Sequence, residues 1–333
     1  MSRYLHLDAP NENGFGGFLK RQFTKPKPLP AGIDLKGGTA IITGGTSGLG
    51  LEAGMQLLGL GLSTLIITSR TQSRGEVAAA KLRTKYPFAT VEAWTLDMTS
   101  YESIDVFARK CDTLPRIDYT ILNVGFIDLK REEAPTGHEM MVQVNYYSTM
   151  YLTTLLVSIL KNKRARQSRP PVLSVVGSDI HYSVDADPEG SAAAFADNPK
   201  NAMGFTQYGI SKYYLLLSII KLAEQIDSNE LILSVCNPGT TKQTDFVANT
   251  PLSFRIPLTI VRGLLGRKVA VGASCYLDAV LVHGQEAHGS FMSDWTIKPF
   301  PEVAYTKAGK AFQTRLWDET MSELRLAQPK VSV

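Results

Sequence analysis

Tyr208 and Lys212 are two side chains whose types and spacing indicate catalysis. The segment reads Tyr-Gly-Ile-Ser-Lys, and this separation puts both side chains on one face of a helix. A phenol titrates near a pKa of about 10, and a nearby ammonium group lowers that pKa by favouring the phenolate. Such a tyrosine donates a proton to an oxygen during reduction, or accepts one during oxidation. Tyr-x-x-x-Lys pairs also occur by chance on surface helices, so the meaning of this pair depends on the elements around it.

Short apolar runs alternate with helical segments from Gly37 onward. The runs lack the polar alternation of half-buried strands, which indicates a parallel sheet covered on both faces. Right-handed crossovers then give a doubly wound sheet, so we predict an α/β protein with a Rossmann-like fold. The expected strands are 39–42, 64–68, 90–94, 119–122, 172–176 and 231–236. The expected helices are 49–60, 72–85, 100–111, 133–160, 208–226, 268–282 and 306–326.

A glycine-rich segment, Thr-Gly-Gly-Thr-Ser-Gly-Leu-Gly at 43–50, lies between the first expected strand and helix. At this turn of a doubly wound sheet, a pyrophosphate meets a helix N-terminus. Gly44 permits the tight turn, Gly48 lets the backbone approach the phosphates, and Gly50 lets the helix pack close to the sheet. An ordinary glycine-rich turn is the alternative, but the strand and helix around it favour a dinucleotide site. The expected contacts are Gly44, Thr46, Ser47, Gly48, Leu49 and Gly50.

The end of the second expected strand indicates which dinucleotide binds. NAD enzymes place a carboxylate there for the ribose hydroxyls, whereas this chain has Ser69 and Arg70. A guanidinium binds a phosphate through paired hydrogen bonds. Arg70, with Ser69 beside it, therefore predicts NADP(H), and Arg74 is a second candidate one helical turn later. The alternative is that Arg70 is an ordinary surface residue.

The threonine followed by G-x-x-x-G-x-G resembles the signature of the short-chain dehydrogenase/reductase family, and Tyr208 and Lys212 fit that family too. The resemblance covers 35 to about 295, and the terminal segments are most similar to fungal members, many of which serve secondary metabolism. It implies that Ser178 hydrogen-bonds the substrate oxygen, and that Asn145 orders a water linking Lys212 to solvent. Asn145 could also be a buried residue that repairs a helix kink. The family's usual Ser-Ser pair is Gly177–Ser178 here.

The resemblance also assigns cofactor contacts to the carboxyl ends of other strands. Asp97 would bond the adenine edge, although it could also cap the next helix. Asn123 and Gly125 would lie near the ribose, with Val124 in place of the usual alanine. A Pro-Gly turn would hold the nicotinamide amide, and one of the threonines at 240, 241 and 244 would bond the amide or the pyrophosphate. The expected contacts are Asp97, Met98, Asn123, Gly125, Tyr208, Lys212, Pro238, Gly239, Thr241 and Thr244.

Two insertions are expected to shape substrate specificity. Ser178 and Tyr208 are 208 − 178 = 30 positions apart, which is more than in many family members. We expect the insert 181–206 to cover the substrate mouth with a short helix near 191–195, and His181 to be a substrate-side or structural residue. The lid 246–265 is apolar, which suggests an apolar substrate, although packing alone would also explain it.

The predicted organisation is an N-terminal arm, 1–36, followed by one catalytic domain, 37–333. Alternating prolines from Lys25 to Pro30 exclude a helix and predict an extended stretch. The arm either packs on the domain surface or makes a peripheral contact with a membrane or a partner. Its apolar side chains are Phe15, Phe18, Leu19 and Phe23.

Composition narrows the classes of function. The chain has 333 residues, 20% of them charged, and a net charge of +4, a balance too weak to indicate nucleic acid as a partner. Its three cysteines form no C-x-x-C pair, which argues against a disulfide framework or a metal site and favours the cytoplasm. The apolar stretches near 151–160 and 213–220 are shorter than the ~18 residues of a membrane span. The N-terminal residues also lack the apolar run of a signal peptide.

These observations predict an NADP(H)-dependent enzyme that interconverts a ketone or aldehyde and an alcohol on a hydrophobic small molecule. In related proteins, the helices equivalent to 268–282 and to the helix near Asn145 form subunit interfaces, so the resemblance also suggests a homo-oligomer. Two other classes stay open, because a fold does not determine chemistry. One is a cofactor-binding protein without redox turnover, and the other is an isomerase or cyclase of the same fold.

Overall fold

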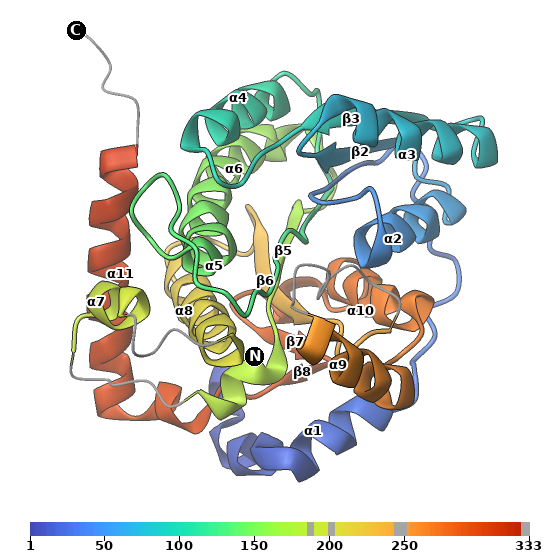
Figure 1. Cartoon of the computed structure of the whole chain (residues 1–333). Coiled ribbons are helices and arrows are strands. Elements are labelled where there is room, and N and C mark those ends of the chain that lie inside the picture. Colours follow the sequence, from blue (N-terminus) through green and yellow to red (C-terminus); the bar gives the residue numbers. More distant parts are fainter. Residues whose placement is uncertain (185–189, 199–203, 243–251, 328–333) are drawn as a thin grey trace, which may run out of the picture.

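In the computed structural model, eight strands form one sheet in the order β3-β2-β1-β4-β5-β6-β7-β8 (Figure 1). The structure describes residues 1–184, 190–198, 204–242 and 252–327. All neighbouring strands are parallel except β7 and β8. The strands are β1 (Thr39–Ile42), β2 (Thr64–Ser69), β3 (Thr90–Thr95), β4 (Tyr119–Leu122), β5 (Val172–Val176), β6 (Ile232–Asn237), β7 (Phe291–Ser293) and β8 (Thr296–Lys298). The predicted doubly wound sheet is confirmed, and β7 and β8 were not predicted.

The central strands are buried on both faces, which explains their unbroken apolar runs. Every residue of β1, β5 and β6 is buried. Successive side chains of a strand point to opposite faces, so Ile41 enters one core while Ala40 and Ile42 enter the other. The strand order reverses between β1 and β4, and the crevice at such a reversal is where doubly wound proteins bind ligands.

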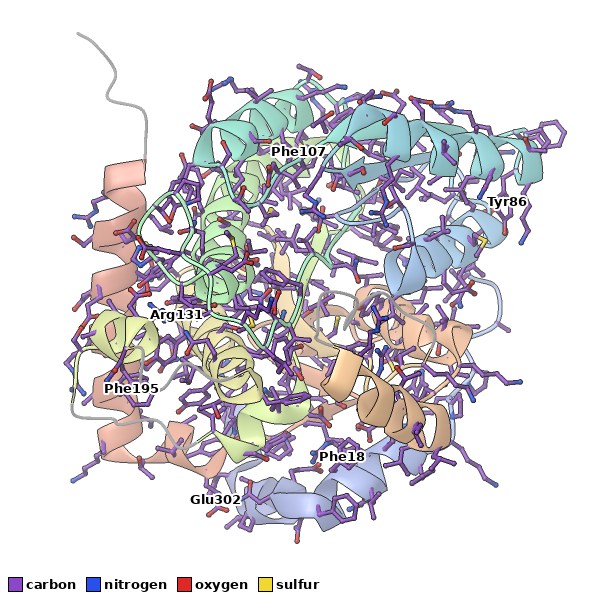
Figure 2. The ribbon with its side chains drawn as sticks, in the orientation of Figure 1. Phe18, Tyr86, Phe107, Arg131, Phe195 and Glu302 are labelled. Atoms are coloured by element: carbon purple, nitrogen blue, oxygen red, sulfur yellow. The ribbon has the colours of Figure 1, made fainter. Side chains whose placement is uncertain are left out.

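Helices cover both faces of the sheet (Figure 1). The core on one face includes side chains from α2, α3 and α10, and the core on the other face includes side chains from α4, α6, α8 and α11. Figure 2 shows Phe107 of α4 among the side chains of the second core. The helices are α2 (Gly48–Gly59), α3 (Gln72–Lys85), α4 (Tyr101–Asp112), α6 (Thr149–Lys163), α8 (Phe205–Ala223), α10 (Val269–Leu281) and α11 (Lys307–Ala327).

The predicted helix 133–160 is wrong at its start. Residues 133–139 form a turn in which Glu133 and Glu139 make an isolated bridge. Pro135 lacks an N–H group and disfavours a helical residue before it, and Gly137 has a φ of +90°. The chain becomes helical at α5 (Met140–Val142), continues through a π-helical segment (Gln143–Ser148) and only then enters α6.

The predicted insertions are described in part. The short helix expected near 191–195 is confirmed as α7 (Ala192–Asp197), with Ser191 accepting a hydrogen bond from Ala194 N at 3.2 Å. Residues 185–189 and 199–203 of the insert lie outside the described residues, as do 243–251, which include Thr244 and the start of the lid. The rest of the lid is α9 (Leu252–Leu265).

The N-terminal arm packs against the domain. It contains two short 3-10 segments and α1 (Gly14–Phe23), followed by residues without regular structure at 24–30, where a helix was excluded. The Met1 ammonium group donates to Ser290 Oγ at 2.7 Å, and Ser2 is fully buried beside Phe291. The alternative in which the arm lies on the domain surface therefore agrees with the structure.

His138 links the 133–139 turn to the insert and to α11. Its Nδ1 lies 2.9 Å from Asp197 Oδ2, and its Nε2 lies 3.4 Å from Glu323 Oε1. Its ring packs on Tyr147, with 4.3 Å between the ring centroids. Burial lowers the pKa of His138, but the hydrogen bond and charge of Asp197 and the charge of Glu323 outweigh burial, so the pKa is raised above 6.5.

We expect this contact to stabilise the fold in a pH-dependent way. Because the folded-state pKa of His138 is raised, its stabilisation is complete below the unfolded pKa and is lost as pH rises through the folded pKa. From pH 6 to 8.5, the difference in free energy of unfolding between wild type and His138→Asn should shrink by about 1 kcal/mol. Urea unfolding measures this difference, with the exposed His6→Asn variant as control. Parallel pH curves for wild type and His138→Asn would refute the expectation.

Candidate active site

Tyr208 and Lys212 lie in the first turns of α8, beside the carboxyl end of β5. Tyr208 is 8% exposed and Lys212 is 3% exposed. Lys212 Nζ donates to the Val176 carbonyl oxygen at 2.7 Å, at the last residue of β5. The same Nζ lies 5.9 Å from the centroid of the Tyr208 ring. The helix therefore presents both side chains to the site, as their spacing predicted.

Burial determines how these two groups titrate. Burial raises the pKa of Tyr208, a hydrogen bond with Ser178 lowers it, and the charge of Asp179 raises it again, so that the pKa lies above 10. Burial lowers the pKa of Lys212 to about 8. The predicted lowering of the Tyr208 pKa is therefore wrong, because desolvation outweighs the hydrogen bond with Ser178. The phenol stays protonated at neutral pH.

Ser178 lies two residues after the end of β5, and its side chain hydrogen-bonds Tyr208. Its Oγ accepts a hydrogen bond from Ile180 N at 3.3 Å, which leaves the hydroxyl proton available as a donor. The structure also explains the glycine before it, since a Cβ at Gly177 would lie 2.5 Å from Val235 Cγ1. Ser174, within β5, hydrogen-bonds Ser234 of β6 at 3.1 Å between their Oγ atoms and has a structural role.

Asn145 lies in the π-helical segment and holds the loop after β4. Its Nδ2 donates to the Phe126 carbonyl oxygen at 2.9 Å, and its Oδ1 accepts from Phe126 N at 3.0 Å. Nδ2 also lies 3.3 Å from Ser211 Oγ in α8. A Cβ at Gly125 would lie 3.2 Å from both Asn145 Oδ1 and Lys212 Nζ. The predicted residues Asn145, Gly125 and Lys212 are thus brought together.

The glycine-rich turn has the conformation that its residues predict. Gly44 and Gly48 have φ angles of +65° and +53°, which favour glycine. A Cβ at Gly50 would lie 2.6 Å from the Gly44 carbonyl oxygen. Asn123 Nδ2 donates to the carbonyl oxygens of Thr43 and Gly44 at 3.1 and 3.3 Å. Asn123 therefore holds the turn in place.

Sequence reasoning missed Tyr276, a further support of this turn. Its hydroxyl donates from α10 to Asn123 Oδ1 at 3.0 Å. The contact joins residues that are 153 positions apart, so no local pattern could have indicated it. His181, in contrast, has a buried ring that contacts Tyr182 and Phe291, which agrees with the structural alternative for this residue.

The residues around the turn fit a phosphorylated dinucleotide. Ser47 precedes α2 and makes no side-chain capping bond, so it leaves the first N–H groups of α2 available to an anion. Arg70 follows β2, is exposed, and has no hydrogen bond or ion pair with the residues that the structure describes. Its guanidinium is available to a phosphate. Thr46 is half-buried and Ser69 is buried beside this region.

Asp97 and the loop after β6 have defined local contacts. Asp97 Oδ1 accepts from Thr99 N at 2.9 Å, and Ser100 caps α4 instead, so the alternative role of Asp97 as helix cap is wrong. Gly239 has a φ of +73°. Thr241 is buried and its Oγ1 donates to the Gly239 carbonyl oxygen at 3.1 Å. Which threonine would contact the nicotinamide stays a prediction.

No group of three or more His, Cys, Asp or Glu side chains suited to a metal ion occurs within the described ranges. The cysteines Cys111, Cys236 and Cys275 are buried and unpaired by disulfides. Across the same described part of the chain, no helix combines the length and apolarity needed to cross a membrane.

Fold and site together define a doubly wound α/β protein with a glycine-rich turn of the dinucleotide-binding kind and a buried tyrosine–lysine pair beside it. The profile of the family described as short chain dehydrogenase matches residues 38–169. The chain is 47% identical to the short chain dehydrogenase virL of Hypocrea virens, covering 97% of this chain and 96% of virL. It is 40% identical to the short chain dehydrogenase/reductase mfmJ of Annulohypoxylon moriforme, over 93% of this chain and 91% of mfmJ.

The chain therefore belongs to the short chain dehydrogenase family, whose members are oxidoreductases that use a nicotinamide cofactor. A short-chain dehydrogenase from Sphingobium yanoikuyae, solved in complex with NADPH, has a similar fold with a TM-score of 0.55 and 16% sequence identity. That similarity covers 89% of this chain and 98% of the Sphingobium chain.

We expect Gly50→Ala to disrupt the turn. The new Cβ would meet the Gly44 carbonyl oxygen at 2.6 Å, so the free energy of unfolding should fall by roughly 1–3 kcal/mol, and NADPH binding should weaken. The matched control is Gly59→Ala in the same helix, where the nearest atom, Tyr86 Oη, lies 3.9 Å from the new Cβ. Urea unfolding and NADPH fluorescence titration measure both effects. Equal stability of the two variants would contradict the close packing.

Proposed function

We propose that this protein is an NADP(H)-dependent oxidoreductase that interconverts a ketone or aldehyde and an alcohol on a hydrophobic small molecule. The observation that carries the proposal is the convergence of Ser178, Tyr208 and Lys212 beside the glycine-rich turn. A proton donor, a second hydroxyl and a cation then surround the position of one reacting oxygen. Carbonyl reduction needs these three functions.

Each side chain has a defined task in this proposal. A nicotinamide held at the glycine-rich turn and the 238–241 loop would supply the hydride. Tyr208 is held as the neutral phenol by burial, and it donates its proton to the substrate oxygen. Ser178 donates a hydrogen bond to the same oxygen and stabilises its developing charge. Lys212, when protonated, stabilises the phenolate that remains, and Asn145 positions the loop after β4 next to Lys212.

Arg70 supports NADP(H) as the cofactor. It follows β2, where an NAD enzyme has a carboxylate, and its guanidinium is exposed and unpaired among the described residues. The guanidinium of Arg70 could donate paired hydrogen bonds to the 2′-phosphate of NADP(H). The NADPH bound to the Sphingobium protein agrees with this choice.

The fungal relatives and the apolar lid support the substrate class. Both curated relatives described above come from fungi, and we propose a secondary metabolite as substrate. In α9, Ile260 and Leu264 are exposed apolar side chains. The three cysteines, unpaired and buried, support a reducing location such as the cytoplasm. Assembly into a homo-oligomer stays a prediction.

Tyr208→Phe tests the chemistry. Purified wild type and variant would be mixed with NADPH and a panel of apolar ketones and aldehydes, and NADPH oxidation would be followed optically. We expect the variant to lose at least about a hundredfold in kcat, because the proton donor is gone, while NADPH affinity is retained. Tyr213→Phe, the same change in the same helix, is the control. Tight NADPH binding by wild type without reduction of any carbonyl would favour a binding protein, or an isomerase or cyclase.

Arg70→Glu tests the choice of cofactor. We expect the Kd for NADPH to rise by roughly tenfold to hundredfold, because two charge-assisted hydrogen bonds are replaced by repulsion. The Kd for NADH should not rise. Arg325→Glu makes the same charge change on the exposed surface of α11 and should affect neither Kd. An equal loss of NADPH and NADH affinity would argue against a 2′-phosphate contact.

A further inference from the structure

Helix α1 of the N-terminal arm carries buried polar side chains, although it lies at the edge of the molecule (Figure 1). Arg21 is 3% exposed and Gln22 is 4% exposed. Burial of a charged or amide group costs free energy unless every polar atom is paired. The partners of Arg21 and Gln22 therefore show where α1 is held.

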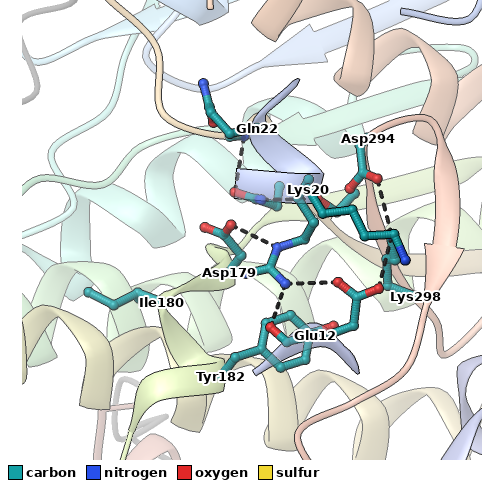
Figure 3. A network of polar contacts seen from close by, with 12 residues as sticks. Glu12, Lys20, Gln22, Asp179, Ile180, Tyr182, Asp294 and Lys298 are labelled. Atoms are coloured by element: carbon teal, nitrogen blue, oxygen red, sulfur yellow. Dashed lines mark hydrogen bonds and ion pairs between the residues drawn. The ribbon is translucent and has the colours of Figure 1, made fainter. Parts of the chain in front are cut away.

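Arg21 is paired with the residue that follows the proposed catalytic serine. Its Nε donates to Asp179 Oδ2 at 3.0 Å, and Asp179 is the neighbour of Ser178. Its Nη1 donates to the carbonyl oxygen and to Oε2 of Glu12 at 2.6 and 2.8 Å. The guanidinium carbon also lies 4.7 Å from the Tyr182 ring centroid. Figure 3 shows Asp179 and Glu12 on this network. The arm thus fixes the segment that begins at Ser178.

Gln22 is paired with the loop after β6. Its Nε2 donates to the carbonyl oxygens of Thr240 and Leu265, both at 2.8 Å, and its Oε1 accepts from Thr240 N at 3.0 Å. Thr240 belongs to the loop that begins with Pro238, and Leu265 ends α9. One amide side chain therefore connects the arm, this loop and the end of the lid helix.

Arg267 completes the connection from the other side. Its Nη1 donates to the Pro238 carbonyl oxygen at 3.0 Å and its Nε to the Gln22 carbonyl oxygen at 3.3 Å, and its Nη2 also bonds the Arg21 carbonyl oxygen. A Cβ at Gly239 would lie 2.8 Å from Arg267 Nη1 and 3.0 Å from Gln22 Oε1. The loop is therefore packed directly against these two side chains.

We propose that α1 is part of the active site, in which Arg21 positions Ser178 through Asp179 and Gln22 positions the 238–241 loop for the nicotinamide. This inference rests on the proposed function for the identity of the loop's ligand. Arg21 and Gln22 are positioning residues, since neither touches the reacting atoms. Their contacts join the segment after β5 to the loop after β6, and a small displacement of either would slow the proposed reaction.

The first test uses Gln22→Met, which keeps the side-chain volume and removes the three hydrogen bonds. We expect faster hydrogen–deuterium exchange at 239–242 and a Kd for NADPH that rises by roughly tenfold. Lys298→Met is the matched control, because Lys298 also anchors the arm, through Glu12 at 3.0 Å, but its ion pairs within the described residues are with Glu12 and Asp294 and not with the 238–241 loop. The control should lower the melting temperature while NADPH affinity stays unchanged. Equal Kd changes in both variants would overturn the role of Gln22.

The second test is a double-mutant cycle of Arg21→Met and Asp179→Asn. If Arg21 acts on Ser178 through Asp179, each single variant should reduce kcat by roughly tenfold or more, and the double variant should be no slower than Arg21→Met. Hydrogen–deuterium exchange at 178–183 should be faster in each single variant than in wild type, and no faster in the double variant than in Arg21→Met. Additive losses in kcat would show that Arg21 acts independently of Asp179, and would overturn the proposal for this residue.

The two proposals fail in different ways. If wild type reduces no carbonyl on the panel, the proposed function fails, and exchange at 178–183 and 239–242 still decides whether α1 positions the two loops. If wild type is active but Gln22→Met and Arg21→Met match the Lys298→Met control in every measurement, the proposed function stands and the role of α1 is refuted.

Discussion

The burial of the parallel sheet on both faces is the constraint on which the rest of this structure depends. Strands such as β5 and β6 leave no exposed side chain along their length, so polar groups gather where the strands end. The strand order reverses between β1 and β4, and doubly wound proteins bind ligands in the crevice at the carboxyl ends of the strands beside such a reversal. The glycine-rich turn, Ser178 and the 238–241 loop all follow strands at this one edge, and α8 brings Tyr208 and Lys212 to it.

The same burial sets the chemistry of the tyrosine–lysine pair. Desolvation opposes the charged form of each group, so the pKa of Tyr208 is raised and the pKa of Lys212 is lowered to about 8. Lys212 compensates by donating to the Val176 carbonyl oxygen. A neutral phenol beside a serine hydroxyl suits proton donation, which is the task that carbonyl reduction gives to Tyr208.

Several elements could be read from the sequence because their causes are local. Gly44 and Gly48 predict a turn with positive φ angles, and the structure has it. The apolar runs predict the strands to within one residue, except that the short β7 and β8 carry too weak a pattern. The helix expected from Glu133 fails because Pro135 and Gly137 favour a turn there. The assignments of site residues stay predictions, although the structure brings Asn145, Ser178, Tyr208 and Lys212 to one edge.

By itself, the sequence determined the doubly wound fold, the turn and the tyrosine–lysine pair, because periodicity, φ preferences and helical spacing act over a few residues. Only the tertiary structure decided what holds these parts in place. Arg21 meets Asp179 across 158 positions, and Gln22 meets Thr240 across 218. Such pairings depend on how the whole chain closes around the sheet. The tertiary structure also decided that the pKa of Tyr208 is raised, because the residues that bury its side chain are distant in the chain.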